Sequence, residues 1–238
     1  MLYINNILDY WLNTHWVLAF IIAAGVNMII YIIAATVLEK LVFVLVEKYK
    51  VGVYISTQEL KPNQKKQEFI NGIIACIIFA LTSLLARLLY VNLWPITVLD
   101  FIIQSIVFTL FYESYSYFIH RLLHKKPLLK FHAVHHRSIR VTPWSAYNVH
   151  PIEALFIGLS APVFMLIFPL SLGVVLTFHV VGMVFTIFIH SNYHFKPSII
   201  GFSKINNYSN THSQHHSFGK GNFGFINSFW DKIFKTKI

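Results

Sequence analysis

Tyr117-Phe118-Ile119-His120-Arg121-Leu122-Leu123-His124 closes a long apolar run and carries the first of four histidine clusters. This cluster has the spacing H-x3-H, and an H-x2-H-H cluster follows it within a dozen residues. The same order of clusters recurs towards the end of the chain. The ten histidines involved are His120 and His124, His132, His135 and His136, His190 and His194, and His212, His215 and His216.

This spacing is typical of a metal site. Imidazole is the commonest metal ligand among side chains, and residues at i, i+3 and i+4 share one face of a helix. We therefore expect each cluster to direct its rings at one point. Ten rings exceed the four ligands of a tetrahedral zinc ion. The pattern predicts a site for two metal ions, with five rings for each ion.

The composition places this site in a membrane protein. Of 238 residues, 56% are apolar and 12% are charged, whereas soluble domains average about 25% charged residues. Apolar runs over residues 16–38, 69–90 and 98–119 have about the length that spans a bilayer as a helix. A fourth run, residues 154–189, is punctuated by prolines and is predicted to form a helical hairpin whose first limb is short. The predicted fold is an all-α integral membrane bundle of three spans plus this hairpin.

The basic residues predict how the bundle is oriented. Residues 39–68, 120–153 and 190–238 each hold six of the nineteen Lys and Arg residues, and only Arg87 lies elsewhere. Three spans plus a hairpin place these segments on one side, which the positive-inside rule assigns to the cytoplasm. The histidine clusters are then expected to form a cytoplasmic cap. The N-terminal segment lacks a basic n-region, so we expect it to lie outside and to remain uncleaved.

Several polar residues near the clusters are candidates for a supporting role. Glu113 and Tyr117 share a helical face with His120, and Glu113 is expected either to orient a ligand ring and balance metal charge or simply to pack between helices. His150 either orients ligands, lines an entry or caps a helix. His179 lies inside the hairpin and either lines a lipid channel or is a buried, hydrogen-bonded histidine.

The number of rings bears on the metal. Imidazole alone suits iron, zinc, copper and nickel. Five rings for each ion leave one octahedral position free, which favours iron that reacts with O₂ over closed tetrahedral zinc. Zinc can refill such a site during overexpression. The lone Cys76 excludes a disulfide framework and an iron–sulfur cluster held by this chain.

At these residues the sequence resembles the fatty acid hydroxylase/sterol desaturase superfamily of membrane non-haem di-iron oxygenases. The resemblance rests on the four clusters, on His150-Pro151-Ile152-Glu153 and on the late Asn222-Phe223-Gly224 … Trp230-Asp231 segment. It covers about residues 98–236, and Lys235 departs from the Phe-Gly-Thr common in the family. It implies ten histidine ligands for two Fe ions, with Glu153 among the supporting residues, and hydroxylation, desaturation or C-4 demethylating oxidation of lipids. Residues 1–97 would form N-terminal transmembrane helices and residues 98–238 the catalytic domain.

Such a reaction needs partners. The chain has no dinucleotide-binding motif and no fused haem domain, so we expect a separate electron donor, a cytochrome b5-like protein or a ferredoxin with its reductase. A basic face would steer an acidic donor, although ordinary contact with anionic membrane lipids also accounts for it. A nucleic-acid partner is not expected. The face consists of Lys125, Lys126, Lys130, Arg137 and Arg140.

Two other functions compete with a lipid oxygenase. A histidine-rich membrane metal transporter or store would need ligands through the membrane centre, and here the clusters lie at one end. A zinc-dependent membrane hydrolase would need a general base, and no H-E-x-x-H motif supplies one. The small size and lack of fused domains favour a bacterial inner membrane over the endoplasmic reticulum.

Overall fold

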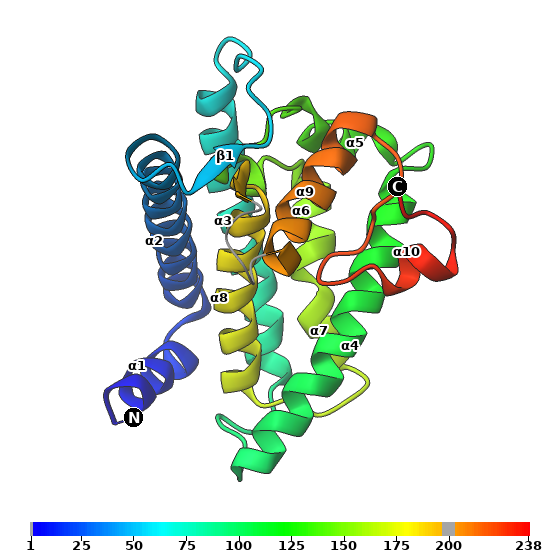
Figure 1. The fold of residues 1–238 in the computed structure, drawn as a ribbon. Coiled ribbons are helices and arrows are strands. Elements are labelled where there is room, and N and C mark those ends of the chain that lie inside the picture. The colour runs from blue at the N-terminus through cyan, green and yellow to red at the C-terminus, as the bar shows by residue number, and fades with distance from the viewer. Residues whose placement is uncertain (1, 197–202) are drawn as a thin grey trace.

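The computed structural model describes residues 2–196 and 203–238, and helices form most of it (Figure 1). The long helices are α2 (Trp16–Phe43), α3 (Gln64–Leu89), α4 (Val98–Leu123) and α8 (Leu172–Ile189). Shorter elements connect and cover them: α1 (Leu2–Asn13), the π-helix η1 (Val44–Lys48), β1 (Gly52–Tyr54), α5 (Leu129–His132), the 3₁₀ turns η2 (His135–Arg137) and η3 (Pro143–Tyr147), α6 (Pro151–Gly158), α7 (Ser160–Met165), β2 (Tyr193–Phe195), α9 (Ser203–Phe218) and α10 (Phe229–Ile233).

Four helices are long and apolar enough to cross a membrane, which confirms a multi-pass helical bundle. They are α3, α4, α8 and a continuous helix, Trp16–Lys48, formed by α2 and η1. The predicted bounds were too short for the first three spans. The first and third helices continue beyond the C-terminal end of their apolar runs, and the second begins before the N-terminal end of its run, because the neighbouring polar residues are also helical.

The fourth apolar run forms the expected hairpin with one short limb. Its first limb consists of α6 and α7, which meet at Leu159, and its second limb is the spanning helix α8. Pro162 explains the break, because its ring would clash with the carbonyl of Gly158 in a continuous α-helix. The first limb begins at the end of the bundle that carries the histidines, where Glu153 contacts His132.

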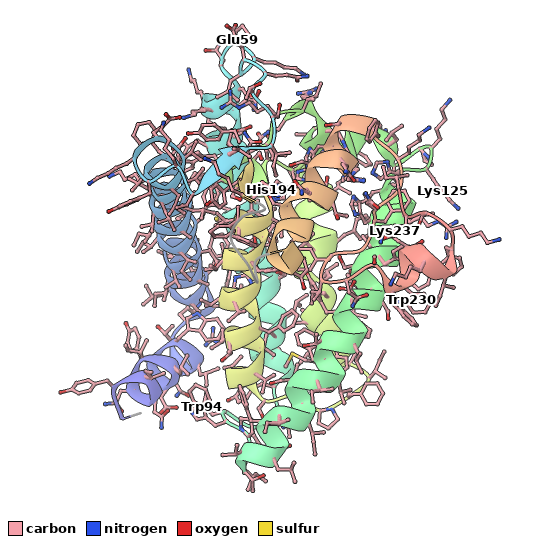
Figure 2. All side chains as sticks on the ribbon, viewed as in Figure 1. Glu59, Trp94, Lys125, His194, Trp230 and Lys237 are labelled. Carbon is pink, nitrogen blue, oxygen red and sulfur yellow. The ribbon has the colours of Figure 1, made fainter. Side chains whose placement is uncertain are left out.

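Two three-residue strands add to the all-α fold that the sequence predicts. β1 and β2 pair antiparallel, with Val53 opposite His194. This pairing ties the segment after η1 to the segment after α8. In Figure 1, β1 and α5 lie at the opposite end of the bundle from α1. In Figure 2, Lys125 and Lys237 lie towards the end that carries β1, and Trp94 lies at the end that carries α1.

The buried core joins the N-terminal helices to the rest of the chain. One cluster contains Tyr31 from α2, Phe79 from α3 and Ile187 from α8. Glu68, fully buried on α3, accepts hydrogen bonds from the Ser138 and Thr142 hydroxyls, 2.7 and 2.6 Å away. These bonds fix the loop that leaves η2. The division at residues 97/98 stays a prediction, since the core extends across it.

Candidate metal centre

Nine of the ten predicted ligands gather into two groups within the described part of the chain. In each group the candidate ligand atoms all lie within 4.8 Å of one another. The five-histidine group draws on α4, α5, η2 and α9, and the four-histidine group draws on η2, α8 and α9. The first consists of His120, His124, His132, His136 and His215, and the second of His135, His190, His212 and His216.

The groups contradict the expectation that each cluster directs all its rings at one point. In each H-x2-H-H cluster the first and last histidines join one group and the middle histidine joins the other, so His135 and His215 exchange places. Adjacent residues point about 100° apart on an α-helix and about 120° apart on a 3₁₀ helix. The rings of His135 and His136 accordingly lie nearly perpendicular, with centroids 6.0 Å apart, as do those of His215 and His216. Each ion site therefore takes rings from both halves of the chain.

The secondary structure of the first H-x2-H-H cluster also differs from the expectation of a single helix. His132 ends the four-residue helix α5, and His135 and His136 lie in the 3₁₀ turn η2. The second cluster does lie on one helix, α9. Two very short elements and one long helix thus deliver equivalent sets of rings.

The nitrogen spacing fits a cation in each group. Nε2–Nε2 distances are 2.9 Å for His120 and His215, 3.0 Å for His132 and His136, and 2.8 Å for His190 and His212. Metal–imidazole bonds of about 2.1 Å at right angles would place two nitrogens about 3.0 Å apart. The observed spacing is therefore that of neighbouring ligands on one ion.

Hydrogen bonds at the far side of the rings strengthen this conclusion. Nδ1 of His120 donates to the Phe223 carbonyl at 3.0 Å, and Nδ1 of His215 donates to the Gly221 carbonyl at 2.7 Å. In the neutral rings the proton is on Nδ1, so the two Nε2 lone pairs face each other. Lone pairs at 2.9 Å repel unless a cation lies between them.

Two further ligand rings are oriented in the same way. Nδ1 of His132 lies 2.8 Å from Oε1 of Glu153, and Nδ1 of His190 lies 2.7 Å from the Thr186 carbonyl. A carboxylate or carbonyl behind an imidazole fixes its tautomer and raises its basicity. Glu153 thus has the supporting position that the resemblance implies.

Burial keeps the rings neutral. Five rings have pKa values well below the usual range. The main cause is desolvation by burial, and the second is repulsion from neighbouring rings. These rings are His132, His135, His212, His215 and His216. Burial lowers the pKa values of His124 and His190 to about 4. A neutral imidazole is the form that binds a metal, so these rings are ready to act as ligands at neutral pH.

His194 is the exception among the ten predicted ligands. It lies on β2, opposite Val53, and in neither group. Its Nδ1 accepts a hydrogen bond from Nδ2 of Asn210 at 2.9 Å. The strand pairing turns the chain after α8, so the helical spacing that relates His190 to His194 in the sequence does not hold.

Two of the expected supporting residues, Glu113 and Tyr117, do not touch a ligand ring. The Glu113 carboxylate accepts the backbone N–H groups of Ile226 and Asn227, at 2.8 and 3.1 Å, which neither alternative for Glu113 anticipated. The hydroxyl of Tyr117 pairs with that of Thr236 at 3.0 Å. Both residues hold the C-terminal segment against α4. That segment carries the Phe223 carbonyl, so their effect on the rings is indirect.

His150 has the capping role. Its Nδ1 accepts the backbone N–H of Ile152 at 3.2 Å, at the start of α6. The cap begins the helix on which Glu153 lies in the first turn. His150 therefore helps to position Glu153, which contacts His132, and does not contact a ligand ring itself.

Asp231 is a residue of the site that the sequence reasoning named without assigning a role. It is buried, and its two carboxylate oxygens accept the backbone N–H groups of Phe223 and Gly224 at 2.9 and 2.8 Å. These bonds fix the turn whose carbonyl orients His120. Asp231 was part of the Asn222-Phe223-Gly224 … Asp231 segment quoted from the sequence, but two of its partners are backbone N–H groups, which a pattern of side chains does not reveal. Its third partner is the Thr236 hydroxyl, which donates to Oδ1 at 2.7 Å.

An apolar cavity of about 420 Å³ adjoins both groups. At one end it is lined by three rings of the four-histidine group and two of the five-histidine group. At the other end it reaches Trp11 of α1 and Leu172 at the start of α8. His179 lines this cavity, is half-buried and forms a hydrogen bond with Asn27. The ring nitrogens therefore stand at the wall of a lipid-like space. The histidines in this wall are His120, His132, His135, His190 and His212.

Comparison with known proteins agrees with this geometry. The chain is 30% identical to lathosterol oxidase of Homo sapiens over 141 residues, which are 59% of this chain and 46% of that protein. It is 32% identical to a Delta(7)-sterol 5(6)-desaturase of Aspergillus fumigatus (55% of this chain, 38% of that protein) and 28% identical to methylsterol monooxygenase 1 of Gallus gallus (52% and 42%). The chain thus spans less than half the length of these relatives. No solved structure gives a significant match.

The family assignment rests on a longer match that contains all four histidine clusters. Residues 105–236, more than half of the chain, match the fatty acid hydroxylase family. The match begins within α4 and ends after α10, so it takes in both histidine groups, Glu153 and Asp231. The resemblance seen in the sequence is confirmed, and this chain belongs to the fatty acid hydroxylase family.

Proposed function

We propose that this protein is a membrane oxidoreductase that hydroxylates or desaturates a lipid C–H bond with O₂ and externally supplied electrons. The single observation that carries the proposal is the convergence of nine Nε2 atoms, in two groups, at the wall of an apolar cavity. The names of the relatives, a sterol desaturase, a sterol oxidase and a methylsterol monooxygenase, support oxidation of a lipid.

The nine histidines would hold two iron ions, which supply the redox chemistry of O₂ reduction when bound. Hydroxylation inserts one oxygen atom into C–H and reduces the other to water, with two electrons and two protons from outside. Desaturation removes two hydrogens from adjacent carbons and reduces O₂ to two waters, again with two external electrons and two protons. Both reactions balance only with an electron donor, because the chain carries no other redox group that we recognise in its sequence.

The surrounding residues position the rings and exclude water. Glu153 and the carbonyls of Phe223, Gly221 and Thr186 fix the tautomers of His132, His120, His215 and His190, so these four rings present Nε2. The wall of the cavity is mostly apolar, so it would seat a hydrocarbon chain or ring system beside the four-histidine group. Oxidation of an unactivated carbon needs this placement, because such a carbon has no functional group to bind directly.

The membrane setting follows from the same proposal. The histidine groups would face the cytoplasm of a bacterial inner membrane, where a cytochrome b5-like protein or a ferredoxin reaches them. Lys125, Lys126 and Lys130 are exposed at this end of the bundle. Charge reversal of Lys125 and Lys126 would then slow reduction of the centre by the donor while leaving the metal content unchanged.

The decisive experiment compares lipids from cells with and without this chain, grown under ¹⁸O₂, with His135→Ala as the control. The expected result is a lipid that gains ¹⁸O or a double bond only with the unchanged chain. Purified protein should contain two metal ions per chain and consume O₂ when lipid and donor are present. Metal flux without O₂ consumption would indicate a transporter, and lipid hydrolysis without O₂ would indicate a zinc hydrolase.

A further inference from the structure

One polar pair lies on the wall of the cavity, away from the metal centre. Asn27 belongs to α2 and His179 to α8, and Nε2 of His179 lies 2.9 Å from Oδ1 of Asn27. Both residues lie within membrane-spanning helices and line the cavity. Polar side chains are costly at this depth and usually mark a pathway or a binding site.

The hydrogen bonds determine which nitrogen of His179 carries the proton. Nδ2 of Asn27 donates to the Cys76 carbonyl at 3.3 Å, which fixes the orientation of the amide. Oδ1 of Asn27 therefore faces His179, and because it can only accept, Nε2 of His179 is the donor. In the neutral ring, Nδ1 is then an acceptor with a free lone pair.

This acceptor has no partner among the described residues. Within residues 2–196 and 203–238, His179 forms a side-chain hydrogen bond through Nε2 only. His179 is half-buried, and its ring lies edge-on to Phe79. A lone acceptor in an apolar cavity favours a ligand that brings a hydrogen-bond donor, and a hydroxyl group is a common neutral donor among lipids.

The position of His179 also sets a distance. His179 precedes His190 of the four-histidine group by eleven residues along α8. At 1.5 Å per residue, the two positions are about 16 Å apart along the helix axis. A lipid bound at His179 and extended along the cavity would present its far end to the rings.

We propose that His179, oriented by Asn27, binds the hydroxyl group of an amphiphilic lipid, and that oxidation occurs at the end of the lipid distal to that hydroxyl. The second part rests on the proposed function, whereas the first part concerns binding alone. His179 acts here as a specificity-determining residue and takes no part in the redox step.

Matched variants separate this role from a purely structural link between α2 and α8. His179→Asn keeps a polar atom near the position of Nδ1 but does not reach Asn27. His179→Gln reaches Asn27 but has no acceptor at the position of Nδ1. Tyr31→Phe is the control, because it removes a 2.7 Å bond from α2 to the Trp144 carbonyl outside the cavity lining.

The test is equilibrium binding of tritiated probes to the metal-loaded protein in lipid nanodiscs. The probes are octadecanol and its methyl ether, and cholesterol and its 3-O-methyl ether, since the ethers keep the oxygen but lose the donor. We expect the unchanged protein and Tyr31→Phe to bind an alcohol about tenfold more tightly than its ether, the worth of one buried hydrogen bond. The preference should disappear in His179→Gln and persist in part in His179→Asn.

Equal binding of alcohol and ether by the unchanged protein, or no binding of either pair, would overturn the proposal. So would a preference that survives in His179→Gln, which would assign the pair a structural role. Whichever pair shows the preference identifies the source of the hydroxyl, a fatty alcohol or a sterol. Because binding needs no turnover, a protein that keeps the preference but forms no O₂-dependent product would refute only the proposed function. A product oxidised beside the hydroxyl would refute only the distal placement.

Discussion

The five-histidine and four-histidine groups use the same ligand atom but differ in how they are supported. The five-histidine group is backed by Glu153 and by two carbonyls of the C-terminal segment, those of Phe223 and Gly221. The four-histidine group has one such support, the Thr186 carbonyl, and three of its four rings line the cavity. The contrast suggests a division of labour, in which the first group anchors an ion and the second presents an ion to the lipid.

The largest expected effect comes from removing a ring of the four-histidine group. His190→Ala leaves three rings on the side that faces the cavity, so we expect the metal content to fall to one ion or fewer per chain and oxidised product to fall more than about a hundredfold. Elemental analysis and product formation on the same sample measure both. Two retained ions with normal turnover would remove the four-histidine group from the reaction.

A smaller effect should follow from removing the support behind His132. Glu153→Gln keeps the shape of the side chain but removes its charge, and we expect a roughly tenfold to hundredfold loss in metal affinity. Glu113→Gln is the matched control, because Glu113 contacts only backbone N–H groups of the C-terminal segment. If both changes weaken metal binding equally, the contact with His132 has no special role.

The acidity of the rings gives a third prediction. A free histidine loses its ability to bind metal near pH 6.5, whereas burial holds the pKa values of His124 and His190 at about 4. The metal-free protein should therefore still take up metal at pH 5.5, with a midpoint at least one pH unit below 6.5. The stability conferred by the neutral rings is present above pH 6.5 and is lost as the pH falls towards 4. A midpoint at pH 6.5 would show that the rings are solvated.

The smallest effect is expected at His194. His194→Ala removes a ring that bonds Asn210 outside both groups, so metal content should stay at two ions and turnover should stay within about twofold. Loss of an ion from this variant would mean that His194 joins the four-histidine group when metal binds, and the two groups would then have equal numbers of rings.

The sequence predicted the spans, the hairpin and nine of the rings because each depends on local properties. Apolar length determines a span, and Pro162 determines the break between α6 and α7. Prediction from the sequence failed where contacts between distant segments determine which group a ring joins. The exchange of His135 and His215 depends on how η2 meets α9, and the displacement of His194 depends on the pairing of β1 with β2.

The supporting residues were predicted least well, for a related reason. Most partners behind the rings are backbone carbonyls, and every residue has one, so no side-chain pattern marks Phe223 or Gly221. Glu113 was expected either to orient a ring or to pack between helices, but its partners come from the C-terminal segment. Glu153 was named only through the family resemblance, and its Oε1 lies 2.8 Å from Nδ1 of His132.

The exchange of His135 and His215 would also affect how the protein acquires the two proposed metal ions. Because each histidine group takes rings from both the α4–η2 region and the α8–α9 region, the first ion to bind would hold these regions together. The second ion then meets rings already in place and avoids the entropic cost of assembling them. Metal uptake should consequently be cooperative. When the metal-free protein is titrated with metal, few chains should hold a single ion at any point.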